Sequence, residues 1–306
     1  MNKKLFLIIN YVISGALLYV LLTQFDFRSI AAGIAGADIR FIAAAALLSV
    51  FFRVVFMPYI WKKALAYSGI EAKFGDLAAS NAVSLPLKFL LPFKISELTR
   101  AAGLKLVTNG SFPVALSSTV LLRFVVLIST VFLLCAGAAL KGYIYISIAG
   151  IALAAAVMYV VFKLAAKAEK GFLKEAAHCF KSVSGKNLAK LMAMGTVFQA
   201  GELVCAYLMF AALNIQAGIP DIIYFVTLMM LASNLPISIQ GLGIRETVAV
   251  LGFSMLPQEV ALSFGILQSA VYHIIPALAG ALIWLFSFTF RAFPLNFRHE
   301  ALENHV

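Results

Sequence analysis

The chain has 306 residues, of which 63% are hydrophobic and 12% charged, and its mean hydropathy is +0.99. Soluble domains are about 45–50% apolar and about 25% charged, so this composition excludes a soluble globular protein and predicts a polytopic helical membrane protein. The net charge of +11 does not indicate nucleic acid, because basic residues beside a membrane set topology and attract anionic lipid.

The apolar runs predict six membrane-spanning helices, each with roughly the 20 apolar residues that a bilayer crossing requires. The first begins after Lys3 and Lys4 and is too long for a typical signal peptide, so we interpret it as a retained helix. Arg53 lies in the middle of the second, where it either snorkels to the surface or faces the bundle. The expected spans cover about residues 5–23, 41–67, 112–139, 143–164, 191–213 and 259–290.

Two further regions, about residues 74–107 and 220–256, are apolar but broken. Each holds two arms that are too short to cross a bilayer, and Pro86, Pro92 and Pro236 interrupt them. A proline at membrane depth leaves backbone carbonyls that only neighbouring protein or trapped water can satisfy. We therefore expect two re-entrant hairpins. The alternatives are eight full crossings or, for the first region, a loop at the membrane surface.

The segment from 163 to 190 carries seven lysines and is the largest positive cluster. We expect it on the cytoplasmic side, which places both chain ends inside and makes residues 291–306 a cytoplasmic tail. Phe172, Leu173, Ala176 and Phe180 fall at helical spacing. One interpretation therefore lays part of the segment flat on the inner leaflet, and the other is a solvated basic connector.

An internal repeat organises the chain as a single membrane domain over residues 1–306. The tetrapeptide VALS occurs at 114–117 and again at 260–263, and the dipeptide LP occurs at 91–92 and 235–236. The halves, about 1–140 and 141–290, each contain three crossings and one hairpin, so the second half is inverted relative to the first. In transporters with this plan, the site lies at the midplane where the broken helices meet.

More cations than carboxylates fall at the expected membrane depth, and the surplus requires anions or water. Glu97 and Arg100 are three residues apart and are expected to pair on one helical face. Arg245 and Glu246 are adjacent and point apart, so each should find a partner elsewhere. Arginine binds phosphate oxygens in a fork, and the N-termini of broken helices add positive dipole, so an anionic lipid head group is the simplest ligand. Ion pairs that only hold the hairpins are the alternative. The cations are Arg53, Lys88, Lys94, Arg100, Arg123 and Arg245, and the carboxylates are Glu97, Glu202 and Glu246.

These residues receive expected roles. The head-group contacts are Lys94, Arg100, Arg123 and Arg245. The residues that orient them or couple transport are Glu97, Glu246 and Glu202. The secondary candidates are Asn81, Lys88, Asn234, Gln268 and His273.

The sequence does not favour an enzyme. The four aspartates lie in expected loops and form no cluster for magnesium. His273 has no evident nucleophile or orienting partner, so a satisfied core histidine is the simpler reading. The three cysteines are unclustered, without metal-ligand spacing or a disulfide framework. We expect no metal and no cofactor.

Residues 91–100, LPFKISELTR, resemble the Pro-x-Arg-x-Gly-Glu-x-x-Arg signature of the flippase-like family, which includes the membrane domain of lysylphosphatidylglycerol synthase/flippase. Residues 117–123 and 235–246 are similar to its two other signatures, so the resemblance covers nearly the whole chain. Lys94 stands where arginine is usual, and Ser96 where glycine is usual. The soluble aminoacyl-transferase domain of two-domain relatives is not found in these residues, so aminoacylation is not carried over.

The resemblance implies translocation of a lipid or a lipid-linked sugar. We therefore expect a flippase or transporter of an anionic lipid or lipid-linked saccharide in the cytoplasmic membrane. Its expected partner is an anionic phospholipid or a polyprenyl-phosphate-type lipid, with no nucleic acid. The alternatives are a lipid-binding accessory subunit or enzyme of a lipid or glycan pathway, and a transporter of ions or small solutes.

Overall fold

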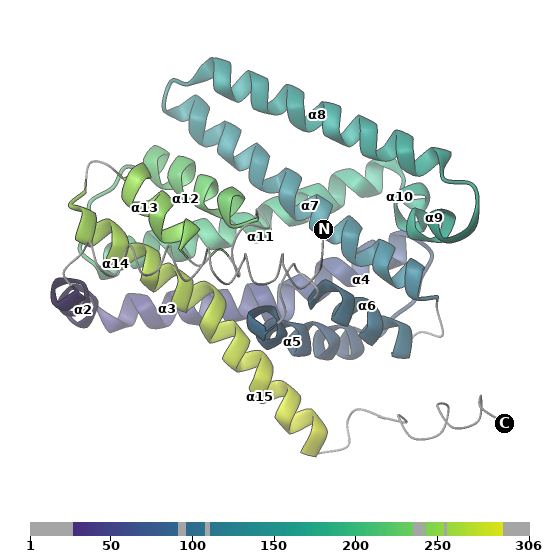
Figure 1. Cartoon of the computed structure of the whole chain (residues 1–306), viewed down its shortest axis with the longest axis horizontal. Helices are drawn as coiled ribbons and strands as arrows, with labels where there is room; N and C mark the ends of the chain where they lie inside the picture. Colours follow the sequence, from purple (N-terminus) through teal and green to yellow (C-terminus); the bar gives the residue numbers. More distant parts are fainter. Residues whose placement is uncertain are drawn as a thin grey trace, which may run out of the picture.

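The computed structural model describes residues 27–90, 96–107, 111–234, 241, 243–253 and 256–289, and within these ranges the chain is helical without a β-strand. Figure 1 shows long helices running between two ends of the molecule. The helix α2 (Phe27–Ala35) lies at one end, here called the α2 end. The helices α9 (Gly171–Ala176) and α10 (His178–Ser182) lie at the other, the α9 end. The expected all-α polytopic class is confirmed.

Within the described ranges, five helices are long and apolar enough to cross a membrane. They confirm the second to sixth predicted spans, with ends that differ by a few residues. A helix of 29 residues is about 43 Å long, which exceeds the roughly 30 Å of bilayer hydrocarbon. The predicted first span, residues 5–23, and the predicted tail, residues 291–306, lie outside the described residues. The five are α3–η1–α4 (Ile39–Val50, Phe51–Phe56, Met57–Tyr67), α7 (Phe112–Leu140), α8 (Ile144–Lys167), α11 (Gly185–Ala212) and α14–η2–α15 (Gln258–Ser269, Ala270–Ile274, Ile275–Thr289).

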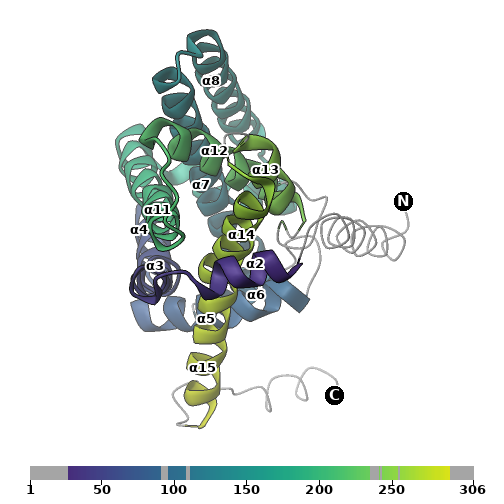
Figure 2. The same cartoon turned by 90° about the vertical axis from the view of Figure 1, so that its left-hand side faces the viewer.

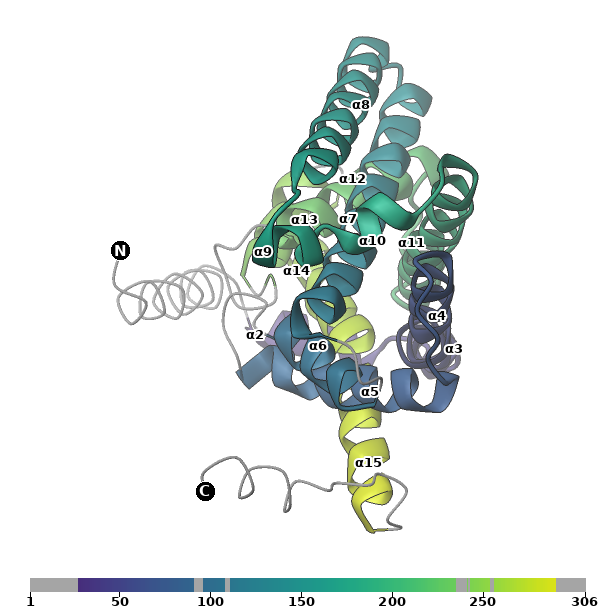
Figure 3. The same ribbon diagram turned by 90° about the vertical axis from the view of Figure 1, so that its right-hand side faces the viewer.

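The first broken region forms a hairpin that enters and leaves at the α9 end. Its arms are α5 (Phe74–Leu90) and α6 (Ser96–Val107), and they pack against each other. Ser68 lies in the connection that leads into α5, and its carbonyl oxygen is 3.2 Å from His178 Nε2. Ser111, just after α6, donates a hydrogen bond of 2.6 Å to Glu175. Figure 3 views the molecule from this end, with α6 drawn below α9 and α10.

The second broken region forms the opposed hairpin, from α12 (Ile219–Ser233) and α13 (Ile244–Gly252). Asp221, in the first turn of α12, forms an ion pair with Lys141, the residue after α7. Phe253, just after α13, packs on Phe210 near the end of α11 with ring centroids 5.2 Å apart. Both ends of this hairpin therefore lie at the α2 end, which faces the viewer in Figure 2. Because α12 has 15 residues, it reaches only about 22 Å.

The helices repeat along the chain in the predicted order. The spans that begin at Ile39 and Phe112 recur 146 residues later, at Gly185 and Gln258. The α3–η1–α4 span runs from the α2 end to the α9 end, whereas α11 runs back to the α2 end, where the Asp38 amide donates to the Ala212 carbonyl at 2.9 Å. The two halves are thus inverted. Within the described residues, five crossings alternate with two hairpins that return to their own side, so neither broken region there makes two full crossings.

Two large apolar cores follow each other along the described part of the bundle. One lies toward the α9 end around Trp61, Leu121 and Phe180, and the other toward the α2 end around Phe210 and Phe264. The long helix α11 contributes to both, with Leu191 and Phe198 in the first core and Cys205 and Met209 in the second. Between these residues it buries Gln199 and Glu202. A polar layer therefore separates the two cores.

The basic connector is shorter than predicted and its apolar residues do not form one face. The helix α8 continues to Lys167 and α11 begins at Gly185. Phe172 and Leu173 are exposed, but Phe180 is buried and stacks edge-on against Phe124 and Phe162. The interpretation that lays these residues together on the inner leaflet does not hold for Phe180, because a turn between α9 and α10 redirects the chain into the core.

Candidate functional site

The first hairpin buries Arg100 in a complete set of partners. Only 2% of this residue is exposed. Its Nε donates to Ser84 Oγ at 3.0 Å, and its Nη1 donates to Glu97 Oε2 at 3.1 Å. Its Nη2 donates to the side-chain oxygen of Asn81. The predicted Glu97–Arg100 pair is confirmed, and Asn81 and Ser84 fix the guanidinium against α5.

Glu97 also forms an ion pair with Arg123 of α7, so one carboxylate serves two arginines. The Arg123 side chain is one-third exposed, and its Nε has no hydrogen-bond partner in the part of the chain that the structure describes. Lys88 is buried at the end of α5, and none of the ion pairs in the described ranges includes it. This cluster therefore contains more positive than negative charge.

The second hairpin builds a different cluster around Arg245 and Glu246, each 2% exposed. Arg245 donates to Ser269 Oγ at 3.0 Å and to Ser233 Oγ at 3.2 Å. Ser269 in turn donates to Glu246 Oε1 at 2.6 Å, and the other carboxylate oxygen accepts the Gly243 amide at 2.7 Å. The expectation that Arg245 and Glu246 point apart is wrong, because both side chains reach Ser269 of α14.

A third group lies in the polar layer between the hairpins. Arg53 of η1 places its guanidinium 4.0 Å from the ring centroid of Tyr272 of η2, and its Nη2 lies 4.0 Å from Glu202 Oε2. The sequence left open whether Arg53 snorkels or faces the bundle. The structure shows that Arg53 faces the interior of the helix bundle, since its side chain is only 14% exposed.

Two prolines explain why this third group sits in π-helical turns. In η1, the Met57 amide donates to the Phe52 carbonyl, five residues back, and Pro58 has no N–H for the Arg53 carbonyl. In η2, the Ile275 amide donates to the Ala270 carbonyl, and Pro276 has no N–H for the Val271 carbonyl.

Polar side chains from other helices satisfy both released carbonyls. Asn81 Nδ2 donates to the Arg53 carbonyl at 2.7 Å, and Ser49 Oγ donates to the Val271 carbonyl at 2.7 Å. Asn81 therefore joins the Arg100 cluster to η1, and Ser49, near the end of α3, joins that helix to η2. A π-helical turn commonly marks a functional site in a helix. The turns η1 and η2 therefore indicate that Arg53 and Tyr272 are functional residues.

The three groups are electrostatically continuous. Arg53 interacts with Lys88 and Arg100 of the first cluster and with Arg245 of the second. In the described ranges, five cations meet three carboxylates in this layer, so two positive charges lack a matching carboxylate. The cations are Arg53, Lys88, Arg100, Arg123 and Arg245, and the carboxylates are Glu97, Glu202 and Glu246.

The remaining predicted residues vary in their placement. Lys94 lies outside the described residues. Asn234 donates to the Met230 carbonyl of its own helix at 3.0 Å. Within the described ranges, the buried Gln268 has neither amide atom hydrogen-bonded, and His273 Nε2 also has no partner. His273 interacts electrostatically with Arg245, Arg53 and Lys88 of the charged layer.

Sequence reasoning did not select Tyr272, Ser269, Ser233 or Ser84 as site residues. The signal for the first two was present, because Gln268 and Tyr272, and Ser269 and His273, are each four residues apart and share a helix face. The serines of the hairpins had no such signal, since isolated serines are common in membrane helices. Among the residues described, no group of three or more His, Cys, Asp or Glu side chains is arranged to hold a metal ion.

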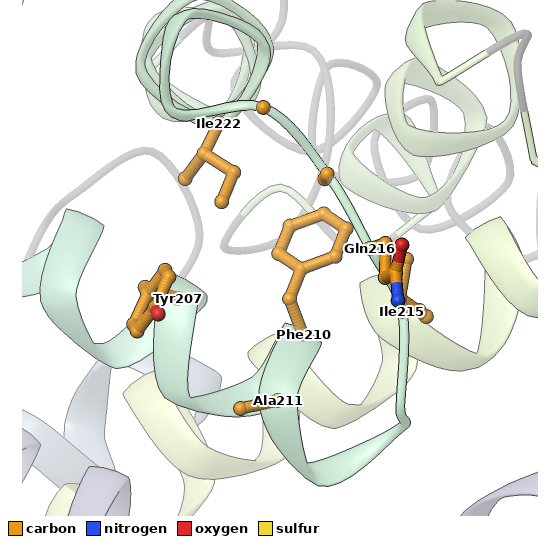
Figure 4. A pocket seen from close by; sticks show the side chains of 8 residues that line it. Tyr207, Phe210, Ala211, Ile215, Gln216 and Ile222 are labelled. Atoms are coloured by element: carbon orange, nitrogen blue, oxygen red, sulfur yellow. The ribbon is translucent and has the colours of Figure 1, made fainter.

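A surface hollow of about 380 Å³ lies away from the charged layer, at the end of α11 (Figure 4). Phe210 and Ile222 point into it, and its other side chains are apolar or neutral. It contains no cation, so it does not match the anion chemistry of the layer.

The family comparison supports the same reading of the chain. The model of the lysylphosphatidylglycerol synthase TM region matches residues 7–280. The chain belongs to this family. The match includes both hairpins and the whole charged layer, and it makes this a multi-pass membrane protein of lipid metabolism or transport. No curated protein matches the chain.

Proposed function

We propose that this protein moves an anionic lipid or a lipid-linked saccharide between the leaflets of the cytoplasmic membrane. The observation that carries the proposal is the buried surplus of positive charge between two opposed hairpins. Burying an unpaired cation costs several kcal/mol, so a chain that keeps this surplus gains from an anion that enters the layer.

The arginines suit a phosphate. Arg123 is the most exposed cation of the layer, and its Nε is free to donate. It therefore makes the first contact with a head group, and Arg100 and Lys88 extend the positive charge along the first hairpin. Arg245 provides the corresponding contact from the second hairpin. Guanidinium groups bind phosphate oxygens in a fork, which positions the head group as well as attracting it.

The carboxylates orient these cations. Glu97 holds Arg100 and Arg123 together, and Glu246 holds Arg245 through Ser269. The inverted hairpins reach the layer from opposite ends. Movement of one hairpin would open the layer to one leaflet, and movement of the other hairpin would open it to the opposite leaflet. The lysine-rich connector would lie on the cytoplasmic side, together with both chain ends.

Leaflet exchange in reconstituted vesicles tests the proposal. Wild type should accelerate exchange of a fluorescent anionic phospholipid, measured by quenching the label in the outer leaflet. Arg245→Ala should lower the rate about 10- to 100-fold, because each charge-assisted contact contributes about 1.5–3 kcal/mol. Arg245→Lys should retain part of the rate, because it keeps the charge and loses the fork.

Arg40→Ala is the matched control, since the Arg40 side chain is 86% exposed and lies at the α2 end. Its rate should equal that of wild type. Equal rates for wild type and Arg245→Ala would refute the proposal. Lipid binding without exchange would instead favour the accessory-subunit alternative, and uptake of a small solute without lipid would favour the third.

A further inference from the structure

The least supported carboxylate of the charged layer is Glu202. Glu97 is held by two arginines, and Glu246 is held by a backbone amide and by Ser269. Among the described residues, Glu202 has one ion pair, with Arg53 at 4.0 Å, and it is 6% exposed in the middle of α11. The charge on Glu202 therefore depends mainly on a single close cation, whereas each of the other two carboxylates has two close partners.

The groups that face Glu202 come from four elements. Arg53 faces it from η1, Arg245 from α13 and Tyr272 from η2, while Cys205 lies one turn along α11 itself. The Tyr272 hydroxyl interacts with Glu202 but makes no hydrogen bond of standard geometry. The two cations thus offset the carboxylate charge, and Tyr272 and Cys205 are neutral neighbours.

Arg53 is in turn available to a second anion. Among the described residues, its Nε has no hydrogen-bond partner. Its guanidinium lies over the Tyr272 ring, and its ion pair with Glu202 is long, at 4.0 Å. It also interacts electrostatically with Lys88 and Arg100, the cations that line the first hairpin. An anionic head group in the layer would therefore compete with Glu202 for Arg53.

We propose that Glu202 is a proton-binding site coupled to the lipid: a head group that takes Arg53 from Glu202 causes this carboxyl group to bind a proton. A buried carboxylate that loses its cation costs several kcal/mol while it stays charged, and a proton removes that cost. One negative charge enters with the lipid and one positive charge with the proton, so the net charge of the layer stays constant. Each head group then moves with a proton in the same direction.

This inference rests on the proposed function, because it assumes that an anionic head group reaches the layer. It adds the energy source: a proton gradient across the membrane would set the direction of lipid movement. The π-helical turns contribute by stacking Arg53 on Tyr272 beside Glu202. Asn81 binds the Arg53 carbonyl of η1, and Ser49 binds the Val271 carbonyl of η2.

Proton uptake on binding tests the inference directly. The full chain in neutral detergent is titrated calorimetrically with dihexanoyl-phosphatidylglycerol, whose phosphodiester keeps one charge at neutral pH, in two buffers of different ionisation enthalpy. Wild type should take up about one proton per lipid, and its affinity should rise up to about tenfold for each pH unit of acidification.

Two variants and one control complete the experiment. Glu202→Gln should bind the lipid without proton uptake and without the pH dependence. Arg53→Gln should also bind without uptake, because Glu202 then holds its proton before the lipid arrives, and this variant tests the coupling even if Glu202→Gln misfolds. Glu71→Gln, on the surface after α4, should behave as wild type.

The outcomes separate this inference from the proposed function. Wild-type binding with no proton uptake would overturn the coupling and leave the head-group site intact. Uptake that persists in Glu202→Gln would also overturn it. No wild-type binding of this lipid would count against the proposed function itself.

Discussion

Replacing Asn81 with leucine tests how the first hairpin is attached to η1. Asn81 is fully buried and uses both ends of its amide, accepting from Arg100 Nη2 and donating to the Arg53 carbonyl at 2.7 Å. Leucine has a similar size, so the substitution mainly removes hydrogen bonds. It leaves a guanidinium donor and a π-helical carbonyl buried without partners.

The magnitude follows from these two losses. An unsatisfied buried polar group costs about 1–3 kcal/mol, and more when it is charged, so Asn81→Leu should destabilise the fold by about 3–5 kcal/mol. For a chain of this size, about 2 °C of unfolding temperature corresponds to each kcal/mol. The expected decrease in Tm is therefore about 6–10 °C, measured by intrinsic fluorescence during heating in detergent.

The matched control is Asn187→Leu, in the first turn of α11, where the side chain is only partly buried. Substitutions at such positions usually change stability by no more than about 0.5 kcal/mol, so its Tm should stay within about 1 °C of wild type. An unchanged Tm for Asn81→Leu would refute the conclusion that Asn81 bridges the Arg100 cluster and η1.

Two further predictions concern packing and thiol chemistry. In Gly137→Ala, the new Cβ would lie 2.7 Å from the backbone nitrogen of Tyr224, so α7 and α12 must separate at a cost of about 1–3 kcal/mol, which lowers the Tm. The control Gly185→Ala places its Cβ where no atom lies within 4 Å, so it should not lower the Tm. Equal Tm values for the two variants would contradict the close packing of α7 on α12. Burial raises the pKa of the Cys179 thiol, which keeps it protonated at neutral pH, so maleimide should modify Cys179 in unfolded but not in folded protein. Peptide mapping by mass spectrometry measures this, and rapid modification of the folded protein at pH 7 would contradict it.

The two hairpins show which parts of the fold could be predicted from the sequence. Pro86 and the short arms were enough to predict that residues 74–107 turn back, because an arm that cannot span the bilayer must return or be covered. The offset of 146 between the VALS segments also predicted the spacing of α7 and α14. The same reasoning missed the break in the basic connector, because helical spacing alone does not show which side a turn faces.

The charged residues show which contacts could not be predicted from the sequence. The Glu97–Arg100 pair followed from a spacing of three within one helix. The roles of Asn81, Ser269 and Tyr272 did not, because each depends on a contact between helices far apart in the chain. The π-helical turns are an intermediate case: Pro58 and Pro276 guarantee stranded carbonyls, but only packing shows that Asn81 and Ser49 satisfy them.

The sequence by itself determined that this chain is a helical membrane protein with two broken, charged regions in an inverted repeat, because hydropathy, proline and charge act locally. The tertiary structure decided which charges meet. It gave Glu97 two arginines and Glu202 a single distant one, and that difference arises from how the opposed hairpins pack against α7 and α11. Long-range packing has no signature in neighbouring residues, so no local pattern could have supplied it.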